Sequence, residues 1–424
     1  MNFERLRAVA CFLLLIFPAV ANLVVGGGSV TLVLFTLLGI VLLFTGRQRP
    51  VLSAAEKLVV GAFAAYFGAY LLSFVVNGLL GNLIDPRTKH LDHEVRMLFV
   101  FPVYMAFRTL RVPPRVLWAA VWIGAAVAGL YGFASFFWLA PGERVSGSYH
   151  YIAFGDLSLA LAFLSLTTCS AFKDRPASRL LIPPSACLLG LAAAILSGTR
   201  GALIAVPVLL CILYFYAAGY LKTTTRLLLL VFCVMGALVV HLVPGVNIDD
   251  RFGSVYSEIA EYSRGKRVYT PVTTRIEGGR AALDIFLENP VIGAGPGNFK
   301  PLLHRLVDEG RRDKIAFPHS QPHSAYLSAM ADCGLIGLSA LLAMFAAPLW
   351  AARRYVKQGG AVLRDLGYSL AVLVASFMQF GLTETIFSRN INVSFYIIMV
   401  AAIMAAAANH ARPGGADDGR RPSP

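Results

Sequence analysis

The feature that most constrains this chain is a series of apolar runs, each about as long as a helix that crosses a membrane. A spanning helix needs roughly 20 consecutive, mostly apolar residues, because the bilayer core offers no water to backbone groups. We place twelve such runs, of which the fourth is short, near residues 8–25, 29–46, 57–79, 96–107, 115–139, 151–172, 179–197, 201–219, 226–245, 324–351, 366–386 and 391–409. We therefore predict an all-α polytopic membrane protein with about 12 transmembrane helices.

Composition supports this class. Hydrophobic residues make up 57% of the chain and charged residues only 14%, which is typical of proteins that use the bilayer in place of a large core. The net charge of +14 could indicate a nucleic-acid partner. We favour another explanation, because the lysines and arginines gather in short links between the apolar runs, as membrane orientation requires.

The basic links also predict the orientation of the chain. Alternate links are rich in arginine and lysine, and the links between them hold far fewer of these residues. Since basic links stay in the cytoplasm, both termini are expected there. Residues 1–24 also resemble a signal peptide, with Arg5 and Arg7 before the apolar run. We interpret them as a span, because cleavage would disturb the alternation.

One long segment is not built like a span. The predicted organisation is transmembrane helices 1–9 in residues 1–245, a periplasmic loop domain in 246–322, transmembrane helices 10–12 in 323–411, and a disordered cytoplasmic tail in 412–424. In the loop, a T-x-x-E capping box predicts a helix that begins at Arg275 and ends at Asn289-Pro290. A glycine-rich turn at 293–297, which could alternatively cradle a phosphate, then precedes a short helix from Pro301 to about Asp308.

His323 and two arginines are the first candidates for chemistry. A neutral imidazole is a natural general base near neutral pH, and His323 stands where an apolar helix begins. Arg200 lies at the tip of a hairpin between two spans, where a guanidinium needs an anionic partner. That partner could be Glu384, Asp156 or a ligand phosphate. Arg275 adds a second fork-shaped donor suited to phosphate oxygens.

Other ionisable residues lie within spans or at their ends, where such groups are functional candidates by default. Asp156, Asp332, Glu384 and Arg389 belong to this set, although a structural ion pair such as Glu384 with Arg389 explains them equally well. Arg280 is a possible supporting residue, and with its basic neighbours Arg305, Arg311, Arg312 and Lys314 it more simply forms a solvated face. His90 and His93 have the spacing of a metal pair, but no third ligand accompanies them, so no metal is expected.

Three motifs together resemble the O-antigen ligase superfamily of bacterial inner-membrane glycosyltransferases. The first is Ser197-Gly-Thr-Arg200-Gly201. The second is Arg275 followed by Ala281-Ala-Leu-Asp-Ile-Phe-Leu-Glu-Asn-Pro-Val-Ile-Gly-Ala-Gly-Pro-Gly-Asn-Phe299. The third is His323-Ser-Ala-Tyr-Leu327 with Gly334-Leu-Ile-Gly337. The resemblance also covers the predicted topology with one large periplasmic loop.

This resemblance implies transfer of a glycan from undecaprenyl diphosphate to an acceptor in the periplasm, with inversion and without metal, nucleotide or other cofactor. It assigns His323 as the essential histidine and Arg200 and Arg275 as the arginines that hold the diphosphate. Two positions depart from the pattern. Ser324 replaces a common Asn, and Asp332 replaces a common Glu, so the resemblance assigns these two residues only weakly.

The resemblance favours an O-antigen ligase, with lipid A–core oligosaccharide as acceptor and membrane lipids as surroundings, in the inner membrane of a Gram-negative bacterium. O-antigen polymerases and protein O-oligosaccharyltransferases of the same superfamily are the alternatives. The single large loop favours a ligase over a polymerase. A flippase or transporter of lipid-linked sugars is the alternative from another class. It would need substrate groups near the middle of the bilayer, whereas the charged candidates cluster at one end of the spans.

Overall fold

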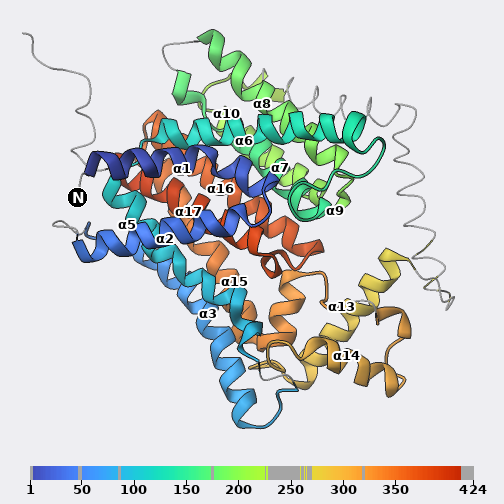
Figure 1. Cartoon of the computed structure of the whole chain (residues 1–424). Helices are drawn as coiled ribbons and strands as arrows, with labels where there is room; N and C mark the ends of the chain where they lie inside the picture. The colour runs from blue at the N-terminus through green and yellow to red at the C-terminus, as the bar shows by residue number, and fades with distance from the viewer. Residues whose placement is uncertain are drawn as a thin grey trace, which may run out of the picture.

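The structure is a computed structural model that describes residues 3–45, 50–84, 87–172, 176–224, 226–227, 258, 262, 264, 270–317 and 320–411. Every regular element in these residues is helical (Figure 1), which confirms the all-α class. The elements are α1 (Phe3–Leu23), α2 (Gly27–Thr45), α3 (Ala54–Leu79), η1 (Thr88–Leu91), α4 (Asp92–Val95), η2 (Arg96–Phe99), α5 (Val100–Leu110), α6 (Pro114–Ala134), η3 (Ser135–Leu139), α7 (Tyr151–Ser165), η4 (Cys169–Phe172), α8 (Pro176–Leu196), α9 (Arg200–Leu203), α10 (Ala205–Ala217), α13 (Pro271–Glu288), α14 (Phe299–Asp308), η5 (Lys314–Ala316), α15 (Ala325–Gln358), α16 (Ala361–Thr383), η6 (Ile386–Ser388) and α17 (Asn390–His410).

In the described part of the chain, eight helices are long and apolar enough to cross a membrane. They are α1, α2, α3, α6 with η3, α9 with α10, α15, α16 and α17. Helix α7 and residues Leu181–Leu196 of α8 are apolar but shorter, and α5 has 11 residues. Each predicted span coincides with one of these helices except 226–245, which lies almost entirely outside the described residues, as does the tail 412–424. A multi-pass helical protein is confirmed, and the count of twelve stays a prediction.

Helix α17 forms the centre of the bundle. Its apolar window is 94% buried, and it packs against α2, α5 and α16. A helix that is apolar on every face needs neighbours on every face, and the sequence of α17 has this character. The ring of Phe377 on α16 stacks near Phe395 and Tyr396 on α17, with centroid distances of 6.3 and 4.8 Å. These large side chains hold the two helices in register.

Helices α13 and α14 stand beside α15 as a small unit with its own apolar core (Figure 1). The core is built from Ala281 and Ile285 of α13 and from Phe299, Leu303 and Leu306 of α14, all buried. Both helices therefore turn their apolar faces toward each other and toward α15. This part of the chain is the described portion of the predicted loop domain.

The predicted start of the first loop helix was wrong. Helix α13 begins at Pro271 rather than Arg275, because Thr270 and Thr273 form a reciprocal capping box one turn earlier. The Thr270 hydroxyl accepts from the Thr273 backbone N–H at 3.2 Å, and the Thr273 hydroxyl accepts from the Thr270 N–H at 3.1 Å. Pro271 at the first helical position has no N–H to lose. The predicted end at Asn289 is confirmed. Helix α14 starts two residues before Pro301.

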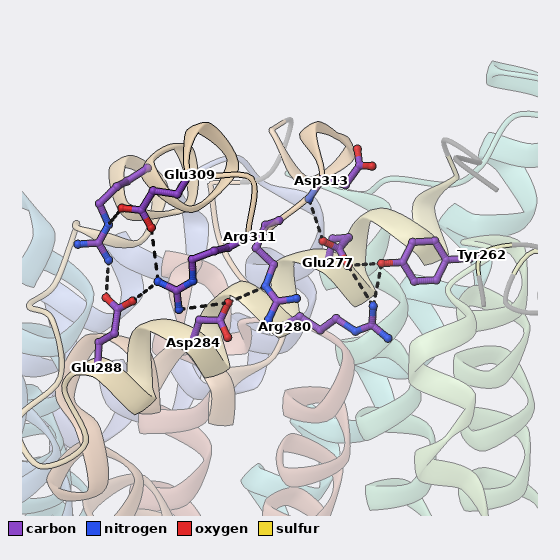
Figure 2. A network of polar contacts seen from close by, with 10 residues as sticks. Tyr262, Glu277, Arg280, Asp284, Glu288, Glu309, Arg311 and Asp313 are labelled. Carbon is purple, nitrogen blue, oxygen red and sulfur yellow. Dashed lines mark hydrogen bonds and ion pairs between the residues drawn. The ribbon is translucent and has the colours of Figure 1, made fainter. Parts of the chain in front are cut away.

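Charged side chains tie α13 to the link after α14 (Figure 2). Arg312 donates to Asp284 at 2.7 Å, and Arg305 and Arg311 both pair with Glu288. The backbone N–H of Asp313 donates to the buried Glu277 at 3.1 Å. These arginines were predicted to form a solvated face, and the structure shows that they are paired with carboxylates of the same unit.

A kink in α15 joins the second and third sequence motifs. Gly334 has a φ of +63° within α15, which releases backbone groups from the helical ladder. The chain after α13 satisfies them, since Leu335 N–H donates to Pro290 O at 2.8 Å and Gly295 N–H donates to Asp332 O at 3.0 Å. A Cβ on Gly293 would lie 2.3 Å from the backbone nitrogen of Cys333. The glycines therefore allow two backbones to touch, and this contact fixes α13 against α15.

Candidate active site

His323 lies two residues before α15, in the left-handed backbone region with a φ of +53°. A non-glycine residue there is strained, and such residues persist where their surroundings fix them. The neighbouring Ser324 supplies this support. Its hydroxyl caps α15 by accepting from Leu327 N–H at 3.4 Å and donates to the Gly381 carbonyl of α16 at 3.3 Å. Ser324 thus binds the start of α15 to the end of α16.

Glu384 is the direct partner of His323. Its Oε2 atom lies 3.3 Å from Nδ1 of His323, and its Oε1 atom lies 3.4 Å from Nη2 of Arg389. The Glu384 side chain is only 3% exposed, whereas those of His323 and Arg389 are 21% and 19% exposed. The predicted structural pair between Glu384 and Arg389 is therefore present. No pattern in the sequence indicated that His323 shares the same carboxylate.

The charges around Glu384 keep it ionised. Burial by itself raises the pKa of Glu384, but the hydrogen bond from His323 and the guanidinium groups of Arg389 and Arg275 bring its pKa below the ordinary value. An ionised carboxylate can only accept hydrogen bonds. Nδ1 of His323 must then donate to it, which leaves Nε2 as the unprotonated nitrogen of the neutral ring.

Arg200 is exposed at the first position of α9. The hairpin before it is held by hydroxyl groups, with Ser197 Oγ donating to Thr199 Oγ1 at 2.9 Å and Thr199 Oγ1 donating to the Tyr151 carbonyl at 3.0 Å. Just after it, Gly201 approaches Thr383 so closely that a Cβ would lie 2.4 Å from the threonine hydroxyl. Thr383 directly precedes Glu384, so the fold brings the Arg200 hairpin next to the carboxylate partner of His323.

Arg275 approaches the same place from α13. Its side chain is exposed, and its charge contributes to the lowered pKa of Glu384. The backbone contact between Gly293 and Cys333 fixes the orientation of α13 relative to α15. His323 therefore contacts Glu384, and Arg275 acts on it electrostatically. The hairpin that carries Arg200 lies against the neighbouring Thr383.

The other predicted residues lie further out. Arg280 Nη1 donates to Tyr262 at 2.9 Å and pairs with Glu277 at 3.3 Å (Figure 2), so it braces α13. Asp332 accepts from Ser328 at 3.1 Å and is nine residues after His323, roughly 13 Å along a helix. Asp156 on α7 is buried and lies close enough to Glu384 to interact electrostatically with it.

Two residues near the site were missed from the sequence. Arg144 donates from Nε to the Ser197 carbonyl at 3.0 Å and from Nη2 to the Gly198 carbonyl at 2.9 Å, so it fixes the Arg200 hairpin. His150 caps α7, and burial together with the charges of Arg389 and Arg144 lowers the pKa of its imidazole. The signal that could have found Arg144 was its place among the few cations of the links with little positive charge.

Among the described residues, no group of three or more His, Cys, Asp or Glu side chains could hold a metal ion. His90, one half of the H-x-x-H pair, packs its ring against Gly297, where a Cβ would lie 2.6 Å from the imidazole. The imidazole ring of His90 therefore packs against the glycine-rich turn 293–297.

The spans, with a cluster of one carboxylate, one histidine and several arginines at one end, define a multi-pass membrane protein with a polar site at the end of its bundle. Residues 185–342 match the family model described as O-antigen ligase. Over that stretch, this match bears out the predicted resemblance to the O-antigen ligase superfamily. At the level of the family, it indicates a glycosyltransferase of the ligase or polymerase type. An uncharacterized protein of Haemophilus influenzae is 22% identical over 319 residues, which cover 75% of this chain and 78% of that protein.

Proposed function

We propose that this chain is an inverting, metal-independent glycosyltransferase that transfers O-antigen from undecaprenyl diphosphate to lipid A–core oligosaccharide. The observation that carries the proposal is the hydrogen-bonded pair of His323 and Glu384, with His323 inside the stretch that matches O-antigen ligase. The distribution of basic links supports a location of this end of the bundle at the periplasmic face of a Gram-negative inner membrane, with both termini in the cytoplasm.

His323 is the general base of the proposed reaction. Glu384 accepts from Nδ1, so Nε2 is the ring nitrogen that takes the proton of the acceptor hydroxyl. The hydroxyl oxygen forms a bond to the anomeric carbon of the donor sugar while the bond from that carbon to the diphosphate oxygen breaks. The electron pair leaves with undecaprenyl diphosphate, and attack from the opposite side inverts the configuration. Glu384 stabilises the imidazolium that forms, as the carboxylate does in a Ser-His-Asp triad.

Arg200 and Arg275 bind the donor diphosphate. Guanidinium groups form paired hydrogen bonds with phosphate oxygens and keep their charge at all relevant pH values. Near the membrane, where the dielectric constant is lower than in water, they neutralise the charge that develops on the leaving group. Arg280 and Asp332 support the site indirectly, through α13 and α15, and Arg389 holds Glu384.

The polyprenyl tail lies among the spans, which explains why a glycosyltransferase of this type is built from membrane helices.

The proposal is tested by complementation of a Gram-negative strain that lacks its O-antigen ligase. The wild-type gene should restore laddered lipopolysaccharide on a gel, and His323→Ala should restore none at equal protein level. His410→Ala is the matched control, because His410 is exposed at the far end of α17. An active His323→Ala variant would contradict the mechanism. Restored chain length without transfer to the core would identify a polymerase instead.

A further inference from the structure

A cavity of about 460 Å³ opens between α10, α15 and α16. Its lining includes Tyr220, Tyr368, Arg364 and the glycine pair that joins α15 to α16, Gly359 and Gly360. Arg364 lies in the first turn of α16, and Glu384 lies just beyond its last residue. The 23 residues of α16 span about 34 Å, so the cavity is at the opposite end of the bundle from the candidate active site.

The guanidinium of Arg364 is built into the wall of this cavity. Its Nη2 atom donates to the Tyr216 carbonyl at 3.1 Å, and it lies over the Tyr220 ring at 5.3 Å. A Cβ on Gly219 would collide with it, so only glycine leaves room for the side chain there. Its Nε atom is buried and has no hydrogen-bond partner among the described residues. A buried donor of a charged group without a partner is costly, so this guanidinium is short of acceptors within the protein.

The carboxylate of the next residue does not pair with Arg364. Asp365 is fully buried and accepts from the Tyr216 and Tyr220 hydroxyl groups at 2.8 and 2.7 Å and from the Ser170 N–H at 2.6 Å. The oxygens of Asp365 therefore accept hydrogen bonds that hold Tyr220, which lines the cavity. No ion pair joins Arg364 to a carboxylate in the part of the chain that the structure describes. The cavity therefore keeps a positive wall.

Two further features favour an anion. Helix α16 starts at Ala361, directly after Gly360. Because glycine has no side chain that could cap the helix, the first backbone N–H groups of α16 border the cavity without a side-chain cap. Such groups attract phosphate. Arg353, Arg354 and Lys357 are exposed on the last turns of α15, which also supply Val356 of the cavity lining. Since α15 and α16 are both membrane spans, their junction lies at the depth of lipid headgroups.

We infer that this cavity binds the phosphodiester headgroup of an anionic phospholipid. Arg364 and the first N–H groups of α16 contact the phosphate, and the basic residues of α15 favour a headgroup with net negative charge. The acyl chains then lie along the apolar surfaces of α10 and α16. The site does not depend on the proposed glycosyl transfer, because it is made of different residues at the other end of the spans.

The test measures lipid adducts on the purified full chain by native mass spectrometry, with short-chain phosphatidylglycerol, phosphatidylcholine and inorganic phosphate as separate probes. Phosphatidylglycerol should bind at least about tenfold more tightly than phosphatidylcholine, and Arg364→Gln should remove this preference. Arg353→Gln is the matched control on the exposed face and should retain it. If inorganic phosphate competes at the same concentration as phosphatidylglycerol, the site is a phosphate site and the lipid assignment is wrong.

A second variant separates binding from folding. Ala361→Glu puts a negative charge at the start of α16, which favours the helix through its dipole but repels an anion in the cavity. It should keep the thermal unfolding midpoint and weaken phosphatidylglycerol binding at least about tenfold, whereas Ala361→Gln should bind as the wild type does. Unchanged binding in both Arg364→Gln and Ala361→Glu would overturn the proposal.

Discussion

Nδ1 of His323 lies 3.3 Å from Oε2 of Glu384, although the two residues are 61 positions apart. The contact exists because Ser324 caps α15 and at the same time donates to Gly381 near the end of α16. A histidine that donates to a buried carboxylate has one fixed tautomer, in which the other ring nitrogen is unprotonated. The relation between these two residues therefore determines which atom can take part in proton transfer.

Replacement of Glu384 by Gln should lower kcat about 10- to 100-fold with a smaller effect on KM for the donor. A Gln side chain can also donate to Nδ1, so it no longer enforces the tautomer that leaves Nε2 unprotonated. The measurement is the initial rate of ligation by purified enzyme across pH. A merely structural role would lower the amount of folded enzyme and leave the shape of the pH profile unchanged. Glu309→Gln, at an exposed surface pair with Arg305, is the control and should change neither.

Replacement of Arg275 or Arg200 by Lys should raise the KM for the lipid-linked donor by about tenfold, because lysine keeps the charge but loses the fork that binds two oxygens. The KM for the acceptor should stay within about twofold. Steady-state kinetics with each substrate varied in turn would measure both values. Arg305→Lys is the control, since Arg305 pairs with Glu288 on the surface of the loop unit. Equal changes in both KM values would argue against a diphosphate site.

The apolar runs predicted the helices well because the need to bury backbone groups in lipid is a local property of each run. The motifs likewise indicated His323, Arg200 and Arg275. The predicted start of α13 was wrong. The T-x-x-E pattern at Thr274 competed with a capping box formed by Thr270 and Thr273, which Pro271 reinforces. Both patterns satisfy the same local rule, and only the packing of the loop unit decides between them.

The contact of His323 with Glu384 could not be predicted, because it depends on how the end of α16 is placed beside the start of α15. The kink at Gly334 could not be predicted either, because it depends on contacts between distant parts of the chain. Its freed backbone groups are acceptable only because Pro290 and Gly295 lie opposite them. Long-range backbone pairing of this kind leaves little trace in a sequence beyond the glycines that permit it.

That pairing leads to a stability prediction. Gly334→Ala should destabilise the protein by more than about 2 kcal/mol, because its φ of +63° disfavours any Cβ and the new atom would meet the Val291 carbonyl carbon at 2.5 Å. Gly278→Ala is the matched control. A Cβ at Gly278 in α13 meets nothing within 4 Å, so alanine there should stabilise by roughly 0.5–1 kcal/mol. Thermal unfolding of both variants in one detergent measures the difference, and equal midpoints would show that the kink is not required.

Glu94 in α4 gives a prediction about pH. Burial raises the pKa of Glu94 to about 8, and its Oε2 atom has no hydrogen-bond partner among the described residues. The folded protein therefore holds this proton more tightly than the unfolded chain does. The protonated carboxyl contributes stability that is full below the ordinary pKa of 4.5 and declines as pH rises toward 8.

The thermal unfolding midpoint should thus fall from about pH 5 to about pH 8, and Glu94→Gln should flatten this decline. Glu309→Gln, which removes an exposed partner of Arg305, should leave the slope as it is in the wild type. A Glu94→Gln variant with the full wild-type slope would mean that another group titrates in this range.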